Sequence, residues 1–251
     1  MSVADLFHLF VACHIVTGSV GLVAFWVPVG GRKGGPTHGR FGMLFIQTML
    51  ATGGFAVLIS LCTLADPIGT HPHLLHHELF GSAQSIRAIF GWMMLYLAIL
   101  TVNLAWYGYQ CIRNKRAYKK NREWRNVALQ GLLGVAALNC LVQGALAGQV
   151  LMIGISFVGF ATVATNLYFL YKPKPGPKEW LLEHIKGLVG AGISVYTAFF
   201  AFGAVRLLPE AALTPALWSA PLIVGVSLII YHRRRIERGT FRPFRRTPKT
   251  A

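Results

Sequence analysis

Residues 87–110 read RAIFGWMMLYLAILTVNLAWYGYQ, and residues 111–126 read CIRNKRAYKKNREWRN. The first stretch has one charged residue, Arg87, in 24 positions, and is long enough for a helix that crosses the roughly 30 Å hydrocarbon core of a bilayer. The second stretch has seven Lys and Arg residues, which is typical of a short cytoplasmic loop. Together they predict a membrane helix whose C-terminal end faces the cytoplasm.

The composition of the whole chain agrees with this reading. Of its 251 residues, 54% are hydrophobic and only 13% are charged, whereas soluble domains have about 25% charged residues. The apolar residues also run in long blocks, without the alternation of a half-buried strand. The chain therefore has too few charges to cover a soluble surface.

Six further apolar stretches have a similar length, so the sequence predicts seven spans. The N-terminus has neither the Lys or Arg nor the clear cleavage site of a signal peptide, and the first stretch is expected to remain as a membrane helix. We therefore expect an all-α fold, with a seven-helix transmembrane domain over residues 1–232 and a basic cytoplasmic tail over 233–251. The spans cover approximately residues 5–28, 41–64, 87–110, 127–147, 150–171, 181–206 and 216–232.

The positive charge is concentrated in alternate connections. Of the 24 Lys and Arg residues, 22 fall in the segments 30–40, 111–126, 172–186 and 233–251. Seven spans place these four segments on one face, which the positive-inside rule makes cytoplasmic. The N-terminus is then outside and the C-terminus inside. This topology accounts for the net charge of +16 without nucleic acid as a partner. We expect the protein to lie in the inner (cell) membrane, with the lipid bilayer as its partner.

One outer connection is rich in histidine. Residues 71–80 read HPHLLHHELF, in which His73, His76 and His77 form an H-x-x-H-H pattern that could hold a metal ion. A di-iron desaturase needs several such boxes on the cytoplasmic face, and this one lies on the other face. A seven-helix zinc hydrolase needs an H-x-x-x-H pair in the last span, and a retinal protein needs a Lys there. Residues 216–232 have neither.

A b-type haem is a further candidate cofactor for the outer face. It needs two histidines from different helices at similar depth. His14 in the first span could face His76 or His77, and Arg87 could hold a haem propionate. His14 is the most informative of these, because a histidine within a span is costly unless it has a partner. Arg87 could instead be a snorkelling residue, and the flanking His71 and His73 are expected to be solvated.

A second haem could lie near the inner face. His38 begins the second span and His184 begins the sixth, so both are on the cytoplasmic side. Two haems stacked across the bilayer would make an electron path. Histidines at such interfacial positions are also common without any ligand.

Several polar residues lie inside the predicted spans. Hydrogen bonds between helices would account for them, and a polar cavity for a substrate is the alternative. The residues are Gln47, Asn103, Asn139, Gln143 and Asn166.

Two stretches resemble a bacterial multi-pass membrane family known as a domain of unknown function. Residues 14–44, HIVTGSVGLVAFWVPVGGRKGGPTHGRFGML, match it at His14, His38, Arg40 and Gly42. Residues 179–200, EWLLEHIKGLVGAGISVYTAFF, are similar to a late helix of such proteins. The helices of that family are in turn similar to those of two-haem membrane cytochromes, which implies a comparable fold.

Two classes of function follow. The first is a membrane redox or electron-transfer protein that binds haem or metal through the histidines. The second is a small-solute carrier, or an accessory subunit that joins the other subunits of a membrane complex, without a redox cofactor. Bound iron distinguishes the first class from the second.

Overall fold

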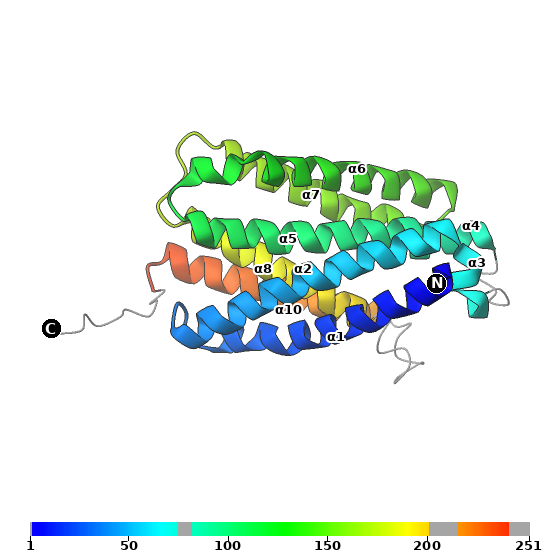
Figure 1. Ribbon diagram of the computed structural model, residues 1–251. Helices are drawn as coiled ribbons and strands as arrows, with labels where there is room; N and C mark the ends of the chain where they lie inside the picture. The colour runs from blue at the N-terminus through cyan, green and yellow to red at the C-terminus, as the bar shows by residue number, and fades with distance from the viewer. Residues whose placement is uncertain (1, 75–81, 201–214, 241–251) are drawn as a thin grey trace.

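The computed structural model describes residues 2–74, 82–200 and 215–240, and in these residues every regular element is helical (Figure 1). The long helices lie side by side in one elongated bundle. They are α1 (Val3–Gly30), α2 (Pro36–Ala65), α5 (Met94–Asn114), α6 (Trp124–Leu146), α7 (Val150–Tyr171), α8 (Glu179–Ala198) and α10 (Pro215–Glu237).

Short elements join the long helices. Asp66 ends α2 and caps α3 (Pro67–Thr70), because its side chain accepts a hydrogen bond of 2.8 Å from the backbone N–H of Gly69. The 3-10 turns are η1 (Pro72–Leu74) and η3 (Tyr118–Arg122). The short helix α4 (Ala83–Ile86) runs through a π-helical segment, η2 (Arg87–Met93), into α5, giving one continuous helix from Ala83 to Asn114.

Five helices in the described part of the chain are long and apolar enough to cross a membrane. They coincide with the first five predicted spans, and they are Val3–Gly30, Pro36–Ala65, Ala83–Asn114, Trp124–Leu146 and Val150–Tyr171. α8 and α10 coincide with the sixth and seventh predicted spans but do not meet the same criterion over their described residues. The all-helical fold is therefore confirmed for the described residues, and the five apolar helices fit a membrane protein. The count of seven spans stays a prediction.

The continuous helix that contains α5 is the centre of the bundle. In its most apolar window 67% of the residues are buried, against 17–33% in the other four candidate spans. α5 packs against α2, α6 and α8, while α1 lies on α2, α7 on α6 and α10 on α8. The main hydrophobic core accordingly surrounds α5 and includes Met93, Tyr96, Leu100, Leu104, Phe45, Met49, Leu133 and Met152.

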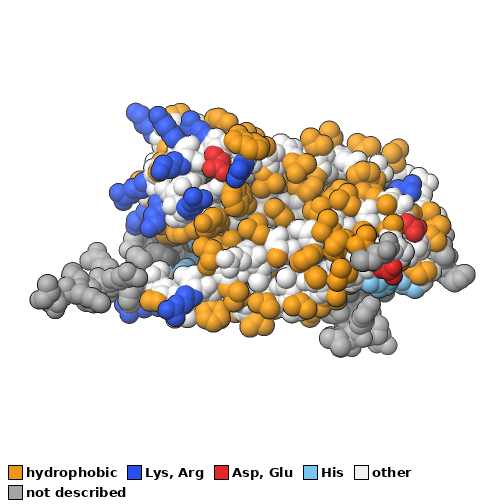
Figure 2. Space-filling model, viewed as in Figure 1, with side chains coloured by type: hydrophobic (Ala, Val, Ile, Leu, Met, Phe, Trp, Pro, Cys, Tyr) orange, Lys and Arg blue, Asp and Glu red, His pale blue; other side chains and the backbone are white. Residues whose placement is uncertain are grey.

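The surface has the distribution of side chains that a bilayer requires. Lys and Arg gather at one end of the bundle and hydrophobic side chains cover its length (Figure 2). Val23 is 73% exposed, Val135 67% and Phe157 59%. All three side chains are apolar, so their contact with water would be unfavourable. Such an apolar belt fits contact with lipid tails. The end that carries the Lys and Arg residues is called the basic end below.

The predicted boundary of the cytoplasmic tail falls inside a helix. α10 continues to Glu237, five residues beyond position 232. Its last turns carry Arg233, Arg234 and Arg235, and cations at the C-terminal end of a helix complement its dipole. Residues 241–251 of the predicted tail lie outside the described residues.

α5 and α8 approach each other closely at a pair of glycines. A Cβ atom on Gly187 would lie 2.8 Å from the Cα of Gly108 and 2.9 Å from the backbone oxygen of Leu104. These are backbone atoms of the central helix, so they cannot rotate away. The contact depends on the absence of a side chain at both positions.

We predict that Gly187→Ala destabilises the protein by about 1–3 kcal/mol, because the new methyl group forces the two helices apart. The melting temperature in detergent can be measured with a thiol-reactive dye, since Cys111 and Cys140 are buried free thiols. Gly134→Ala is the control, as no atom lies within 4 Å of its Cβ position. An equal melting temperature for the two variants would contradict the close packing of α5 on α8.

We also predict that the basic end faces the cytoplasm. In a background without native cysteines, Pro72→Cys and Lys119→Cys place single thiols at exposed positions near opposite ends of the bundle. A membrane-impermeant maleimide applied to intact cells should label the first and should label the second only after lysis. Labelling of Lys119→Cys from outside would reverse the orientation.

Candidate functional site

Three histidines from three helices make the same kind of hydrogen bond. His14 on α1 donates from Nδ1 to the backbone oxygen of Thr52 on α2, at 3.0 Å. His38 on α2 bonds in the same way to Pro28 on α1 at 3.1 Å, and His184 on α8 to Gly108 on α5 at 2.9 Å. A carbonyl oxygen only accepts, so the proton of each neutral ring is on Nδ1 and Nε2 keeps its lone pair.

His38 belongs to a group that covers the C-terminal end of α1. The ammonium group of Lys33 donates to the backbone oxygen of Pro28 at 2.8 Å and also to that of Val29. His38 reaches the same Pro28 oxygen, so carbonyls that a helix end leaves unpaired find partners here. Burial lowers the pKa of Lys33, and the positive charge of Arg235 adds to that effect.

The inner pair predicted from the sequence lies at the basic end. His38 lies near the start of α2 and His184 near the start of α8. Their helices, α2 and α8, contact each other as well as sharing the neighbour α5. His232, on α10, is 9% exposed, and its Nδ1 has no hydrogen-bond partner in the described part of the chain.

Of the predicted outer pair, only His14 is among the described residues. His14 lies in the middle of α1, where its partner is the Thr52 carbonyl of the adjacent helix. This hydrogen bond to the backbone gives His14 the partner that the sequence analysis had expected to be a haem or a metal ion. His76 and His77 lie outside the described residues, and Arg87 is exposed at the start of η2.

The two remaining histidines of the outer connection differ from each other. His73 is exposed, as expected, but the expectation that His71 is solvated was wrong, because His71 is only 8% exposed. Its ring lies 5.1 Å from that of Phe7 and 4.9 Å from that of Phe90, between centroids. Burial, with a smaller contribution from the charge of His73, lowers the pKa of His71 to about 4, so the ring is neutral at pH 7.

The described residues contain no group of three or more His, Cys, Asp or Glu side chains that could hold a metal ion. For the predicted site of His73, His76 and His77, only His73 is among those residues. That site stays a prediction.

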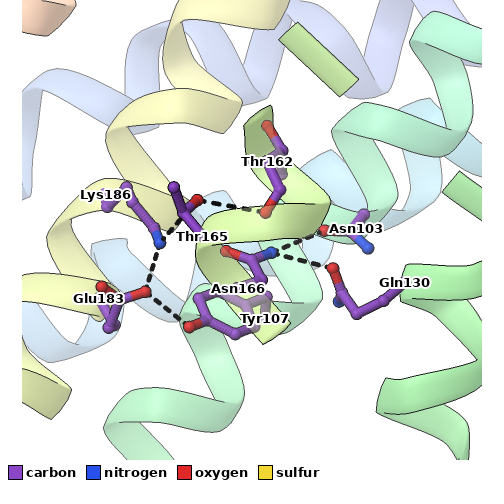
Figure 3. Close-up of polar contacts among 8 residues, drawn as sticks. All are labelled: Asn103, Tyr107, Gln130, Thr162, Thr165, Asn166, Glu183 and Lys186. Carbon is purple, nitrogen blue, oxygen red and sulfur yellow. Dashed lines mark hydrogen bonds and ion pairs between the residues drawn. The ribbon is translucent and has the colours of Figure 1, made fainter. Parts of the chain in front are cut away.

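A second polar group fills the space between α5, α6 and α7. Asn166 donates from Nδ2 to Gln130 Oε1 at 3.1 Å and to Asn103 Oδ1 at 3.3 Å (Figure 3). All three side chains are fully buried. The sequence singled out Asn103 and Asn166 but missed Gln130, which lies close to the basic loop. Its spacing of four from Asn126 would have placed both amides on one face of α6.

An ion pair at the start of α8 lies next to this group. The hydroxyl of Tyr107 donates to Glu183 Oε2 at 2.6 Å, and Glu183 pairs with Lys186. Lys186 also lies 5.4 Å from the centre of the Tyr107 ring and 3.4 Å from Thr165 Oγ1 (Figure 3). Glu183 and Lys186 thus connect the central helix to both α7 and α8.

Comparison with known proteins does not assign the chain to a family. No family model matches the chain, no curated protein is similar to it, and no solved structure matches it. The resemblance of residues 14–44 and 179–200 to a bacterial multi-pass family is therefore without support from a family model. In the residues that the structure describes, the protein is all-helical, and its apolar helices fit a membrane protein.

We predict that His14→Leu lowers the free energy of unfolding by about 1 kcal/mol, because the hydrogen bond between α1 and α2 is lost. The control is His8→Leu, since His8 is exposed and, within the described part of the chain, forms a hydrogen bond only to Ala4 of its own helix. Melting curves in detergent provide the measurement. If His8→Leu destabilised the protein as much as His14→Leu, the interhelical bond would have no special role.

Proposed function

We propose that this chain is a seven-span membrane protein, with its N-terminus outside, that binds a b-type haem between His38 and His184. The single observation that carries the proposal is the shared hydrogen-bonding state of these two histidines. Each is held by a carbonyl of a neighbouring helix through Nδ1–H, and neither Nε2 has a partner among the described residues. Such a bond orients an imidazole and raises its basicity as a ligand.

The inclusion of α8 and α10 among the spans has structural support. They are 20 and 23 residues long and therefore of a length that can cross the bilayer. α8 packs along the central helix α5, and α10 packs along α8. The charges of α8 fall in its first turns at the basic end, where Glu179, its first residue, pairs at 2.5 Å with Lys172 of the preceding connection. Charged residues at a span's end are compatible with crossing.

One cation near His38 could serve a haem. Lys33 provides a cation near His38 for a propionate. Surface hollows at the basic end are lined by residues such as Tyr231 and Arg234 or Tyr168 and Lys172, without histidine. The proposed haem site is separate from these hollows and lies between α2 and α8, the contacting helices that carry the two imidazoles. A bound haem would supply one-electron transfer, and this chain's residues would hold and orient it.

The test is the absorption spectrum of the protein purified in detergent from cells supplied with a haem precursor. We expect a Soret band, and a sharp α band after reduction with dithionite, typical of haem with two histidine ligands. His38→Ala and His184→Ala should each abolish these bands, while His73→Ala, an exposed position, should leave them unchanged.

Haem content is measured in parallel by elemental analysis for iron. Loss of only part of the iron in His14→Ala would place a second haem at the outer pair. A wild-type protein without haem, or with full haem in both inner variants, would reject the proposal and leave the carrier or accessory-subunit class.

A further inference from the structure

A column of buried amide side chains runs from the basic end into the middle of the bundle. On α5, Asn103, Tyr107, Gln110 and Asn114 recur at intervals of three and four, so they share one face of the helix. Facing them are amides of η3, α6 and α7. The amide column comprises Asn103, Gln110, Asn114, Asn121, Asn126, Gln130 and Asn166, and all but Asn114 are at most 1% exposed.

Hydrogen bonds connect these amides from the surface inward. At the basic end Asn114 donates to Asn121 Oδ1 at 2.7 Å, and Gln110 lies 3.5 Å from Glu123 Oε1. One layer deeper, Asn126 donates to the Asn121 backbone oxygen at 2.7 Å. Gln130 then joins the backbone oxygen of Asn126 at 3.4 Å, and beyond it are the bonds of Asn166. Bonds of 3.3–3.5 Å are at the weak end of the range.

Three buried atoms of the column have no partner within the described residues. They are Nδ2 of Asn121, Oδ1 of Asn126 and Oδ1 of Asn166. An unpaired buried amide group costs about 1–3 kcal/mol, and within a bilayer no bulk solvent reduces that cost. One atom is a donor and two are acceptors. A cation would satisfy only the oxygens and an anion only the nitrogen, whereas a neutral molecule that both donates and accepts satisfies all three.

We propose that the amide column binds a file of water molecules and forms a hydrated half-channel from the basic end to Asn103 and Asn166. Water has the required donors and acceptors and is the smallest molecule that provides both. From Asn114 to Asn103 the column follows eleven residues of α5, about 16 Å at 1.5 Å per residue. It gives solvent access to the membrane interior, and it does not depend on the haem proposal, because it contains no histidine.

Two buried tyrosines provide a matched comparison. Tyr107 is 0% exposed and packs against Phe169 and Leu170, one turn beyond Asn166. Tyr96, on the same helix, is 1% exposed, lies in the main hydrophobic core and donates to the backbone oxygen of Ile155. Both are closed to bulk solvent, but Tyr107 lies within the length of α5 that carries the amide column, whereas Tyr96 lies before it. Water bound in the column should therefore lie beside Tyr107 and not beside Tyr96.

The experiment is X-ray radiolysis of the full-length protein in detergent, followed by mass spectrometry. Hydroxyl radicals form from water where it is bound, so we expect Tyr107 to be oxidised several-fold faster than Tyr96. Asn166→Leu should reduce the rate at Tyr107 towards that at Tyr96, and Asn139→Leu, a half-buried amide outside the column, should not.

Equal oxidation rates for Tyr107 and Tyr96 in the wild-type protein would overturn the proposal. That comparison needs no variant, so it decides the matter even if Asn166→Leu does not fold. An unchanged rate at Tyr107 in a folded Asn166→Leu protein would also contradict it. Neither result bears on haem content, so failure of this inference and failure of the proposed function are distinguishable.

Discussion

A membrane-spanning chain must satisfy its polar groups within the protein, because lipid tails offer no hydrogen bonds. This constraint accounts for the helical backbone, and it also accounts for the contacts between helices. Lys33 and His38 cover the carbonyls at the end of α1. His184 reaches a carbonyl of the central helix. Where the constraint is incompletely met, along the amide column, the unpaired atoms indicate bound solvent.

The same hydrogen bonds have two consequences for the histidines. By reaching a carbonyl of another helix, each imidazole joins its own helix to a neighbour, as His14 joins α1 to α2 and His184 joins α8 to α5. The bond also determines which ring nitrogen keeps its lone pair. A side chain that serves packing is thereby left with a nitrogen suited to bind iron. The histidines can therefore be important for stability and for function at once.

Much of the fold was predictable, because span length and charge distribution are properties of local sequence. The first five predicted spans coincide with apolar helices, and the gathering of Lys and Arg at one end follows from the alternation of basic connections. α10 continues to Glu237, past the predicted end of its span at 232, because arginines at the C-terminal end of a helix are compatible with helical structure. The central place of α5 was not predictable, since apolar spans look alike until their packing is known.

The candidate site was predictable in part. Titratable residues in apolar sequence are conspicuous, so His14, His38 and His184 could be found, but a carbonyl partner on another helix leaves no sign in the sequence. His71 was misjudged because Phe7, which covers it, is far away along the chain. Most of the amide column was missed because Asn114, Asn121 and Asn126 lie within the basic stretch 111–126. Gln110 and Gln130 flank that stretch and look like part of it.

The protonation state of the imidazoles tests the central claim most directly. Nitrogen-15 NMR of histidine-labelled protein in lipid bilayers distinguishes a protonated ring nitrogen from one with a free lone pair, and spectra of single-histidine variants assign the signals. At neutral pH we predict that His38 and His184 carry their proton on Nδ1, with Nε2 unprotonated or shifted by bound iron. Signals that show a proton on Nε2 of either ring would contradict both the interhelical bonds and the proposed ligands.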